Sequence, residues 1–191
     1  MAVTMYIEII FPVIFLVISS ILCFWQGSLL FVAVFGTPTV YAYDQAIVDA
    51  LNLAKLKKGE LVVDLGCGNA KSLIIAAKKF RAKGVGVEIS PYCYLKSKWN
   101  VFAAGESKNI RIIFGDFKKA EKYLQNADVV YLYLLNKVLK SIEPWFFDNV
   151  QKDARIVSLS FTFDQKKPVQ TSKTVNLGKP TKISLYKKGT I

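Results

Sequence analysis

The stretch from Glu60 to Glu88, ELVVDLGCGNAKSLIIAAKKFRAKGVGVE, constrains the fold of this chain more than any other segment. It contains an apolar run at 61–65, a glycine turn at 66–68, a helical pattern at about 70–80 and a second apolar run at 85–87. This order predicts a strand, a loop, a helix and a second strand, which together form the first half of a nucleotide-binding α/β sheet.

Gly66 and Gly68 determine what the loop after the first strand can do. Glycine adopts positive φ and carries no Cβ, so the backbone N–H groups of this loop can approach a ligand closely. Glu88 follows the second glycine by 88 − 68 = 20 residues and ends the second predicted strand. A carboxylate at that place accepts hydrogen bonds from both hydroxyls of a ribose. The stretch therefore predicts a ligand that contains a ribose.

The glycine spacing distinguishes between the possible ligands that contain a ribose. A dinucleotide-binding loop reads G-x-G-x-x-G, but Lys71 occupies the third glycine position. A turn without a ligand would bury Asp64 beside two glycines at considerable cost. The pattern D-L-G-C-G at 64–68, followed by Glu88, resembles motif I of the seven-strand S-adenosylmethionine (SAM) methyltransferases. The resemblance implies SAM as the cofactor, in preference to a nicotinamide or flavin nucleotide.

The same resemblance assigns roles to residues of this sequence. In that family the loop lies under the methionine part of SAM and the later acid, here Glu88, holds the ribose. Asp116 closes the third predicted strand, and it would bond the adenine amino group while Phe117 packs on the ring. Asp116 is equally suited to cap the helix that follows. The loop residues implied to contact the cofactor are Asp64, Gly66, Cys67, Gly68 and Asn69.

Composition excludes several kinds of active site. The chain has no histidine, so Ser-His-Asp triads, Cys-His dyads and histidine metal centres are ruled out. The three cysteines, Cys23, Cys67 and Cys93, are far apart and odd in number, so neither a disulfide framework nor a zinc site is expected. We therefore predict reduced thiols and no metal.

An uncharged apolar stretch, IIFPVIFLVISSILCFW at 9–25, lies near the N-terminus. It reaches the lower limit of length, roughly 17 residues, for crossing a hydrocarbon core, and apolar residues continue to Phe35. A cleaved signal peptide would need a basic region in Met1–Tyr6, which has none, and a core helix apolar on every face is unusual in so small a domain. We expect a membrane anchor at 1–36 and a methyltransferase domain at 37–191.

The distribution of charge predicts the orientation of that anchor. All 26 lysines and arginines follow the apolar stretch, so the positive-inside rule places the catalytic domain in the cytoplasm as part of a single-pass membrane protein. The net charge of +12 comes from scattered basic pairs, which suit a solvated surface or anionic lipid headgroups. Because no RNA-binding module is recognisable, nucleic acid is an unlikely partner on this pattern.

The remaining sequence alternates between the two kinds of element. Helical patterns occur at 44–56, 92–104, 119–124 and 137–150, and strand patterns occur at 110–114, 128–134, 155–161, 174–177 and 182–186. We predict an α/β fold with a doubly wound, mostly parallel seven-strand sheet, Rossmann-like, with an antiparallel hairpin at one edge. One transmembrane helix precedes it.

The segment after the fourth predicted strand indicates the substrate class. The box Asn-Pro-Pro-Tyr marks methylation of bases or glutamine amides, but this chain has YLLN at 133–136. Arg155-Ile-Val-Ser158 and Phe161 resemble the R-V-V-S-x-x-F segment of the archaeal and mitochondrial protein-lysine methyltransferases, which include those acting on the ATP-synthase c-subunit and the adenine nucleotide translocase. The mitochondrial members also carry a membrane segment and then a T-P-Y-V-P box, where this chain has Thr37–Tyr41.

This second resemblance covers about Thr37 to Phe163 and implies a membrane-anchored protein-lysine N-methyltransferase. Its partner would be a protein with an accessible lysine, near or in the membrane. It implies that Tyr41 lies at the cofactor, and that Tyr133 and Phe161 line an aromatic substrate channel, with Tyr131 and Trp145 as further candidates. Ordinary core packing is the alternative for these aromatic residues.

Two departures and two rival functions stay open. The chain has Gly68-Asn69-Ala70 where relatives have G-D-G or G-S-G, and its box differs at Thr39 and Tyr41. A lipid or small-molecule methyltransferase of the same fold fits the same motifs. A catalytically inactive SAM-binding membrane partner fits them as well.

Overall fold

The computed structural model describes residues 2–35 and 41–189. The expected boundary between anchor and domain, at 36/37, lies outside the described residues. So do Thr37–Val40 of the box that precedes motif I. Tyr41, at the end of the box, is described.

A seven-stranded sheet forms the middle of the domain, in the order β3-β2-β1-β4-β5-β7-β6. β7 is antiparallel to both of its neighbours, whereas β1 to β5 are all parallel to one another, which confirms the predicted sheet and edge hairpin. The strands are β1 Leu61–Leu65, β2 Lys83–Glu88, β3 Ile110–Phe114, β4 Val129–Leu132, β5 Arg155–Leu159, β6 Gln170–Asn176 and β7 Lys179–Lys187.

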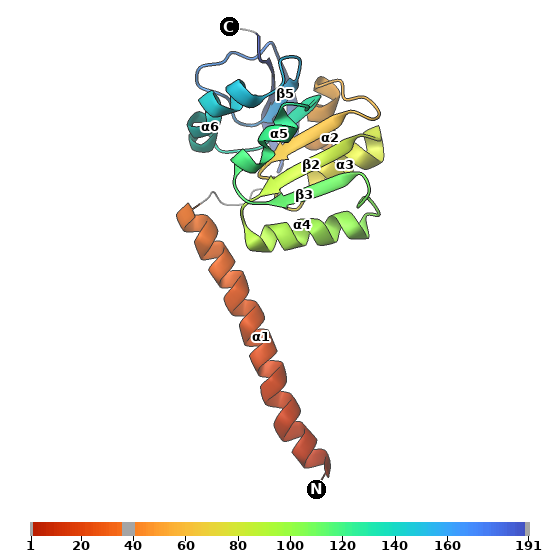
Figure 1. Cartoon of the computed structure of the whole chain (residues 1–191), viewed down its shortest axis with the longest axis vertical. Helices are drawn as coiled ribbons and strands as arrows, with labels where there is room; N and C mark the ends of the chain where they lie inside the picture. Colours follow the sequence, from red (N-terminus) through yellow and green to blue (C-terminus); the bar gives the residue numbers. More distant parts are fainter. Residues whose placement is uncertain (1, 36–40, 190–191) are drawn as a thin grey trace.

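Helices cover both faces of this sheet, as a doubly wound fold requires (Figure 1). One face carries α2 Asp44–Leu53, α3 Lys71–Phe80 and α4 Pro91–Ala103. The other face carries the 3₁₀ helix η1 Phe117–Ala120, α5 Glu121–Leu124 and α6 Asn136–Asn149. The first of these helices is shorter than the expected 44–56, because Lys55 has a positive φ of 50° that ends the helical turn.

The sheet has a hydrophobic core on each face, which explains why the central strands are continuous apolar runs. Val62 and Val63 of β1 are both fully buried but belong to different core clusters, one on each face of the sheet. Strands that are covered on both sides need apolar side chains at every position. Leu73 of α3 fills the first core, and Phe146 of α6 fills the second.

The strand order also fixes where a ligand can bind. From β1 the chain proceeds outward through β2 and β3, and it then returns to the other side of β1 as β4 and β5. The two directions diverge between β1 and β4. In open α/β sheets a crevice forms at such a point, outside the carboxyl ends of the strands.

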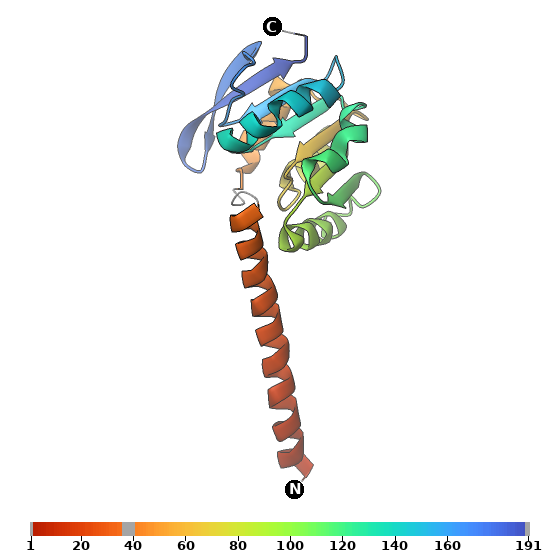
Figure 2. The same cartoon turned by 60° about the vertical axis from the view of Figure 1, so that its left-hand side comes forward.

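The N-terminal segment is one helix, α1 Ala2–Phe35, which extends away from the domain in both views (Figures 1 and 2). Its stretch Ile9–Ser28 is long and apolar enough to cross a membrane, with a mean hydropathy of 2.3. That assignment rests on length and composition alone. The helix continues through Gly27 to Phe35 as one element.

Candidate active site

The loop after β1 is held against the end of β2 by its own backbone. The N–H groups of Gly66 and Cys67 both donate to the carbonyl oxygen of Val87, at 2.8 and 3.1 Å. Gly66 and Gly68 have φ of +76° and +55°, as the sequence pattern predicted. A Cβ on Gly66 would lie 3.0 Å from a methyl group of Leu134, so this position is also crowded.

Glu88, the last residue of β2, joins this loop to the next helix. It is buried, and its Oε2 accepts the N–H of Gly68 while its Oε1 accepts the N–H of Ser90, both at 2.8 Å. Burial raises the pKa of the Glu88 carboxyl, and the backbone donors at Ser90 and Gly68 oppose that rise. The backbone N–H of Ile89 also lowers the pKa of this carboxyl. A carboxylate has about four lone-pair sites, so Glu88 can still accept a donor from a ligand.

Gly86 in β2 is a residue that the sequence pattern did not single out. A Cβ at this position would lie 2.6 Å from the Sγ of Cys67 and 2.9 Å from a methyl group of Leu73. Only glycine lets the loop and α3 pack this closely onto β2. A lone glycine inside an apolar run was the available signal, because it often marks such a close approach.

Asp64 is a second buried acid beside the loop. Its carboxylate accepts the hydroxyl hydrogen bond of Ser72 from α3. Burial raises the pKa of Asp64 to about 7, the Ser72 bond opposes the rise and the charge of Glu88 adds to it. A cation that binds nearby would therefore favour the ionised form of this carboxyl group.

A small hollow of about 40 Å³ opens at this place, between the carboxyl ends of β1 and β4. The hydroxyl of Tyr131 is buried and has no hydrogen-bond partner within the described chain. Tyr41 is 38% exposed, and burial, together with the neighbouring Cys93, raises its pKa to about 12. The hollow is lined by motif I residues, by the tyrosines of the box and of the fourth strand, and by neighbouring residues: Tyr41, Ala42, Ile47, Asp64, Gly66, Cys67, Gly68, Asn69, Lys71, Ser72, Tyr131 and Tyr133.

Asp116 and Phe117 lie at the end of the neighbouring strand β3. Asp116 is exposed, and its side chain caps η1 by accepting the N–H of Lys118 at 3.0 Å. In this structure Asp116 therefore acts as the helix cap that the sequence offered as the alternative to adenine binding. Phe117 is half-buried, and its ring would lie 3.8 Å from a Cβ built on Gly66. Phe117 is therefore adjacent to the glycine loop.

Tyr133 and Phe161 come together at the carboxyl ends of β4 and β5, with ring centroids 5.9 Å apart. The side-chain amide of Asn176 donates to the Tyr133 hydroxyl at 3.0 Å, and its oxygen accepts the N–H of Tyr43. Asn176 had no signal in the sequence, because the register of the edge hairpin alone brings it here. Trp145 packs against the second core cluster, which Phe161 also borders, whereas Tyr133 packs against the first.

The segment R-I-V-S-L-S-F at 155–161 positions this aromatic pair. Arg155 pairs with Glu60 at 2.7 Å and donates to the carbonyls of Ala54 and Lys55, so it fixes the start of β5. The hydroxyl of Ser158 donates to the carbonyl of Phe161 at 2.8 Å, which turns the chain after the strand. Arg155 therefore has a structural role, and Ser158 orients Phe161.

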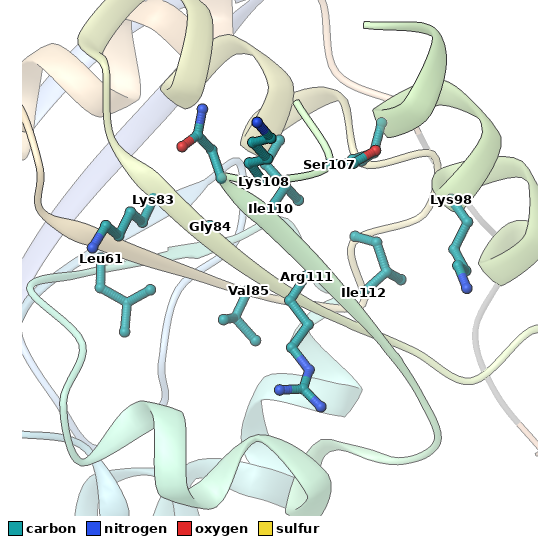
Figure 3. A pocket seen from close by; sticks show the side chains of 12 residues that line it. Leu61, Lys83, Gly84, Val85, Lys98, Ser107, Lys108, Ile110, Arg111 and Ile112 are labelled. Atoms are coloured by element: carbon teal, nitrogen blue, oxygen red, sulfur yellow. The ribbon is translucent and has the colours of Figure 1, made fainter. Parts of the chain in front are cut away.

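A larger hollow of about 560 Å³ lies elsewhere, at the amino ends of β1, β2 and β3 (Figure 3). Its described lining includes four basic side chains and no acidic one: Lys83, Lys98, Lys108 and Arg111. The glycine loop and Glu88 do not border it. Because it lies at the opposite end of the strands from the crevice, it is separate from the candidate active site.

Comparison with known proteins decides the family. The model of the ANTKMT methyltransferase domain matches residues 64–170, which begin at Asp64 and include both aromatic residues of the pair. The chain belongs to this methyltransferase family. A protein-lysine N-methyltransferase of Saccharolobus islandicus is 30% identical over 125 residues, covering 65% of this chain and 76% of the relative.

Two further comparisons agree with the family. The human lysine N-methyltransferase of the ATP-synthase c-subunit is 26% identical over 132 residues, which is 69% of this chain but only 54% of the human protein. An RNA methyltransferase from Salinibacter ruber, solved with S-adenosyl-L-homocysteine, aligns with a TM-score of 0.68 and 29% identity, covering 79% of this chain and 93% of that one. The chain is a SAM-dependent methyltransferase of the Rossmann-like class, and SAM is its cofactor.

Proposed function

We propose that this methyltransferase transfers the methyl group of SAM to lysine side chains of proteins at a membrane. The observation that carries the proposal is the Tyr133–Phe161 pair, which stands beside the hollow of the glycine loop at the carboxyl edge of the sheet. Two aromatic faces at that place suit the aliphatic stem and cationic head of lysine. The names of the archaeal and human relatives support the same substrate class.

The residues of the crevice fit SAM. The ammonium of Lys71 lines the hollow but is bonded to Asp44 and the carbonyl of Ala42. The Tyr131 hydroxyl, which has no partner in the described chain, and the buried Asp64 carboxyl suit the polar, cationic methionine end of SAM. Gly66 and Gly68 keep the floor of the hollow free of side chains. Glu88 has lone pairs for the ribose hydroxyls, and Asp116 with Phe117 would take the adenine end. Tyr41, Cys67 and Asn69 complete the lining around the methionine end.

When bound, SAM supplies an electrophilic methyl group on a sulfonium centre. The protein has to align a neutral amine with that methyl group and exclude water. Tyr133, fixed through Asn176, and Phe161, fixed through Ser158, form rigid walls for the lysine stem. Removing the ammonium from water between these rings favours loss of its proton, because desolvation disfavours the charged form. With SAM bound, the neutral amine would take the methyl group, the N–C bond forming as the S–C bond breaks, and the lysine proton would already have passed to water.

Calorimetry on the detergent-solubilised full chain tests the cofactor residues. We expect SAM to bind and NAD not to bind, since the loop lacks the third glycine of a dinucleotide motif. Glu88→Ala should weaken SAM binding by about 1–3 kcal/mol, the scale of losing hydrogen bonds to a buried acceptor. Glu121→Ala, which removes an exposed acid of α5, should leave binding unchanged. Equal SAM affinity in the wild type and Glu88→Ala would remove this assignment.

Labelling with tritiated SAM tests the substrate class. Cell membranes and a cytosolic extract are incubated with the purified chain, and the label is then counted separately in protein, lipid and RNA. Label in protein that is lost with Glu88→Ala supports the proposal. Label confined to lipid would favour the small-molecule alternative, and label in RNA would favour the activity named for the Salinibacter neighbour. SAM binding without any transfer would indicate an inactive SAM-binding partner.

The membrane anchor and its orientation belong to the same proposal. The apolar helix α1, together with the restriction of all 26 basic residues to the part of the chain after it, supports a single span with the domain in the cytoplasm. Cys93 is buried and is a poor reporter of sidedness, whereas Lys152 is exposed. A membrane-impermeant thiol reagent on intact cells should leave Lys152→Cys unlabelled until the cells are opened. Labelling of that cysteine in intact cells would reverse the orientation.

A further inference from the structure

Helix α4 presents two apolar stripes on opposite sides, and only one is used inside the domain. Cys93, Ser97 and Val101 are buried against the sheet. On the opposite side, Leu95, Trp99 and Phe102 are exposed by 55%, 67% and 68%. The rings of Trp99 and Phe102 lie 6.0 Å apart, so the outer stripe is continuous. Large apolar side chains grouped in this way on a surface mark an interaction site.

The stripe carries the charges of a membrane-binding helix. The sequence of α4, PYCYLKSKWNVFA, contains Lys96 and Lys98 and no acidic residue. Lys98 also lines the basic hollow beside the helix, together with Lys108 (Figure 3). Aromatic and aliphatic side chains on one face with flanking lysines are typical of helices that lie in the headgroup region of a bilayer. Tryptophan in particular prefers that depth.

The position of α4 next to α1 indicates that a lipid bilayer covers the outer stripe. The hydroxyl of Ser28 lies 3.1 Å from that of Ser90, the N-cap of α4, and it accepts the N–H of Tyr92 at 3.2 Å. Ser28 lies in the polar break at 26–28 that follows the uncharged apolar stretch 9–25, and that stretch reaches roughly the length needed to cross a hydrocarbon core. If that stretch spans the bilayer, the first turn of α4 lies at the bilayer surface.

The two views agree on the direction of the helix. α4 lies at the end of the domain from which α1 extends, and it runs crosswise to α1 (Figures 1 and 2). A helix crosswise to a membrane span, with its first turn bonded to the end of that span, lies along the membrane plane. Its outer stripe is the part of the domain that the bilayer can cover.

We infer that α4 is a second membrane-binding element, which rests on the surface of the bilayer that α1 crosses, with Leu95, Trp99 and Phe102 inserted at the headgroup boundary. The inference rests on the proposed anchoring by α1. It adds that the catalytic domain does not swing freely on its tether. The two contacts hold the crevice at one height above the bilayer, so the enzyme selects lysines that lie close to the membrane surface.

Fluorescence quenching by lipid tests this inference on the full chain. The chain is reconstituted into phosphatidylcholine–phosphatidylglycerol vesicles with brominated acyl chains, which quench tryptophans at the boundary. Three variants each keep one tryptophan and are checked for SAM binding. The first keeps Trp99, with Trp25→Phe and Trp145→Phe. The second keeps only Trp25 in α1 and reports on the anchor.

The third variant is a control with no native tryptophan and Val169→Trp. Val169 is 42% exposed, and its N–H donates to Leu185, two residues before the end of β7. The chain leaves β7 towards the C-terminus, which both views mark at the end of the molecule away from α1 (Figures 1 and 2). A tryptophan there reports on quenching without membrane contact.

We expect Trp99 to lose most of its fluorescence, as Trp25 does, while Val169→Trp is unaffected. Quenching of Trp25 with Trp99 no more quenched than the Val169→Trp control would overturn the inference and leave the anchor intact, so that a protein partner would have to cover the stripe. Quenching of Trp99 without Trp25 would refute the anchor and overturn the inference as stated, because α4 would not then rest on a bilayer that α1 crosses. If neither is quenched, both the anchor and the inference fail.

Discussion

Asp64 should make SAM binding depend on pH in a way that one substitution removes. Burial raises the pKa of this carboxyl from 3.8 to about 7 in the chain without cofactor, against the opposing hydrogen bond of Ser72. In the proposed site the ammonium group of SAM enters the hollow that Asp64 lines, and a cation there favours the ionised carboxylate. SAM therefore binds the ionised form better, and its affinity rises as the pH approaches 7.

The size of the effect follows from the pKa. With a pKa of about 7, roughly nine-tenths of the molecules carry a protonated Asp64 at about pH 6. If only the ionised form binds, the apparent affinity falls about eightfold between about pH 7.5 and pH 6, equivalent to ~1.3 kcal/mol. An α-amino group such as that of SAM is half deprotonated at about pH 7.7, so the affinities near the upper end of the window have to be corrected for the fraction of SAM that is still a cation.

Calorimetry across that window, in wild type and Asp64→Asn, measures the effect. Asparagine still accepts the Ser72 hydrogen bond but cannot titrate, so Asp64→Asn should bind SAM more weakly near neutral pH and without the slope. Glu88→Gln shows how much of the slope belongs to the second buried acid, whose pKa burial also raises. The same pH dependence in Asp64→Asn and wild type would refute the reasoning.

Linkage gives an independent check without SAM. The folded-state pKa of Asp64 exceeds its unfolded value, so the folded chain binds more protons between about pH 4 and pH 7 and stability falls as the pH rises through that range. Asp64→Asn should therefore raise the midpoint of thermal unfolding more at neutral pH than at about pH 4.

Three further substitutions test the packing and the channel. Gly86→Ala should lower the free energy of unfolding in urea by about 1–3 kcal/mol through overpacking, whereas Gly189→Ala, in open space, should not. Arg155→Ala should cost about 2 kcal/mol, because an ion pair and several carbonyl bonds are lost, and should leave the SAM affinity unchanged; exposed Arg111→Ala is the control. Tyr133→Phe should lower kcat/KM with unchanged SAM affinity, whereas a purely structural role would lower stability alone.

The local pattern was sufficient for much of the fold. The first strand and the third strand begin and end where expected, at Leu61–Leu65 and Ile110–Phe114, because each apolar run is bounded by polar or glycine residues. The positive φ of Gly66 and Gly68 followed from the same pattern. The mostly parallel sheet with an antiparallel edge hairpin followed from the alternating strand and helix patterns.

Features that depend on strand register, or on which face of a helix is buried, could not be predicted from the sequence. Asn176 reaches Tyr133 only because β6 pairs with β7 in one register. The expected helix at 119–124 begins as a 3₁₀ turn at Phe117, because Asp116 caps it earlier. Periodicity could not tell which stripe of α4 is buried, because both stripes contain apolar residues. The roles of Asp116 and Phe117 toward adenine stay predictions.

The identity of the methylated residue tests the account most directly. Protein labelled by the full chain with tritiated SAM is hydrolysed in acid, and the radioactive amino acids are separated. We expect label in Nε-methylated lysine from membrane proteins, absent with Glu88→Ala and present with Glu121→Ala. Label in another amino acid, or methyl-lysine that persists with Glu88→Ala, would contradict it.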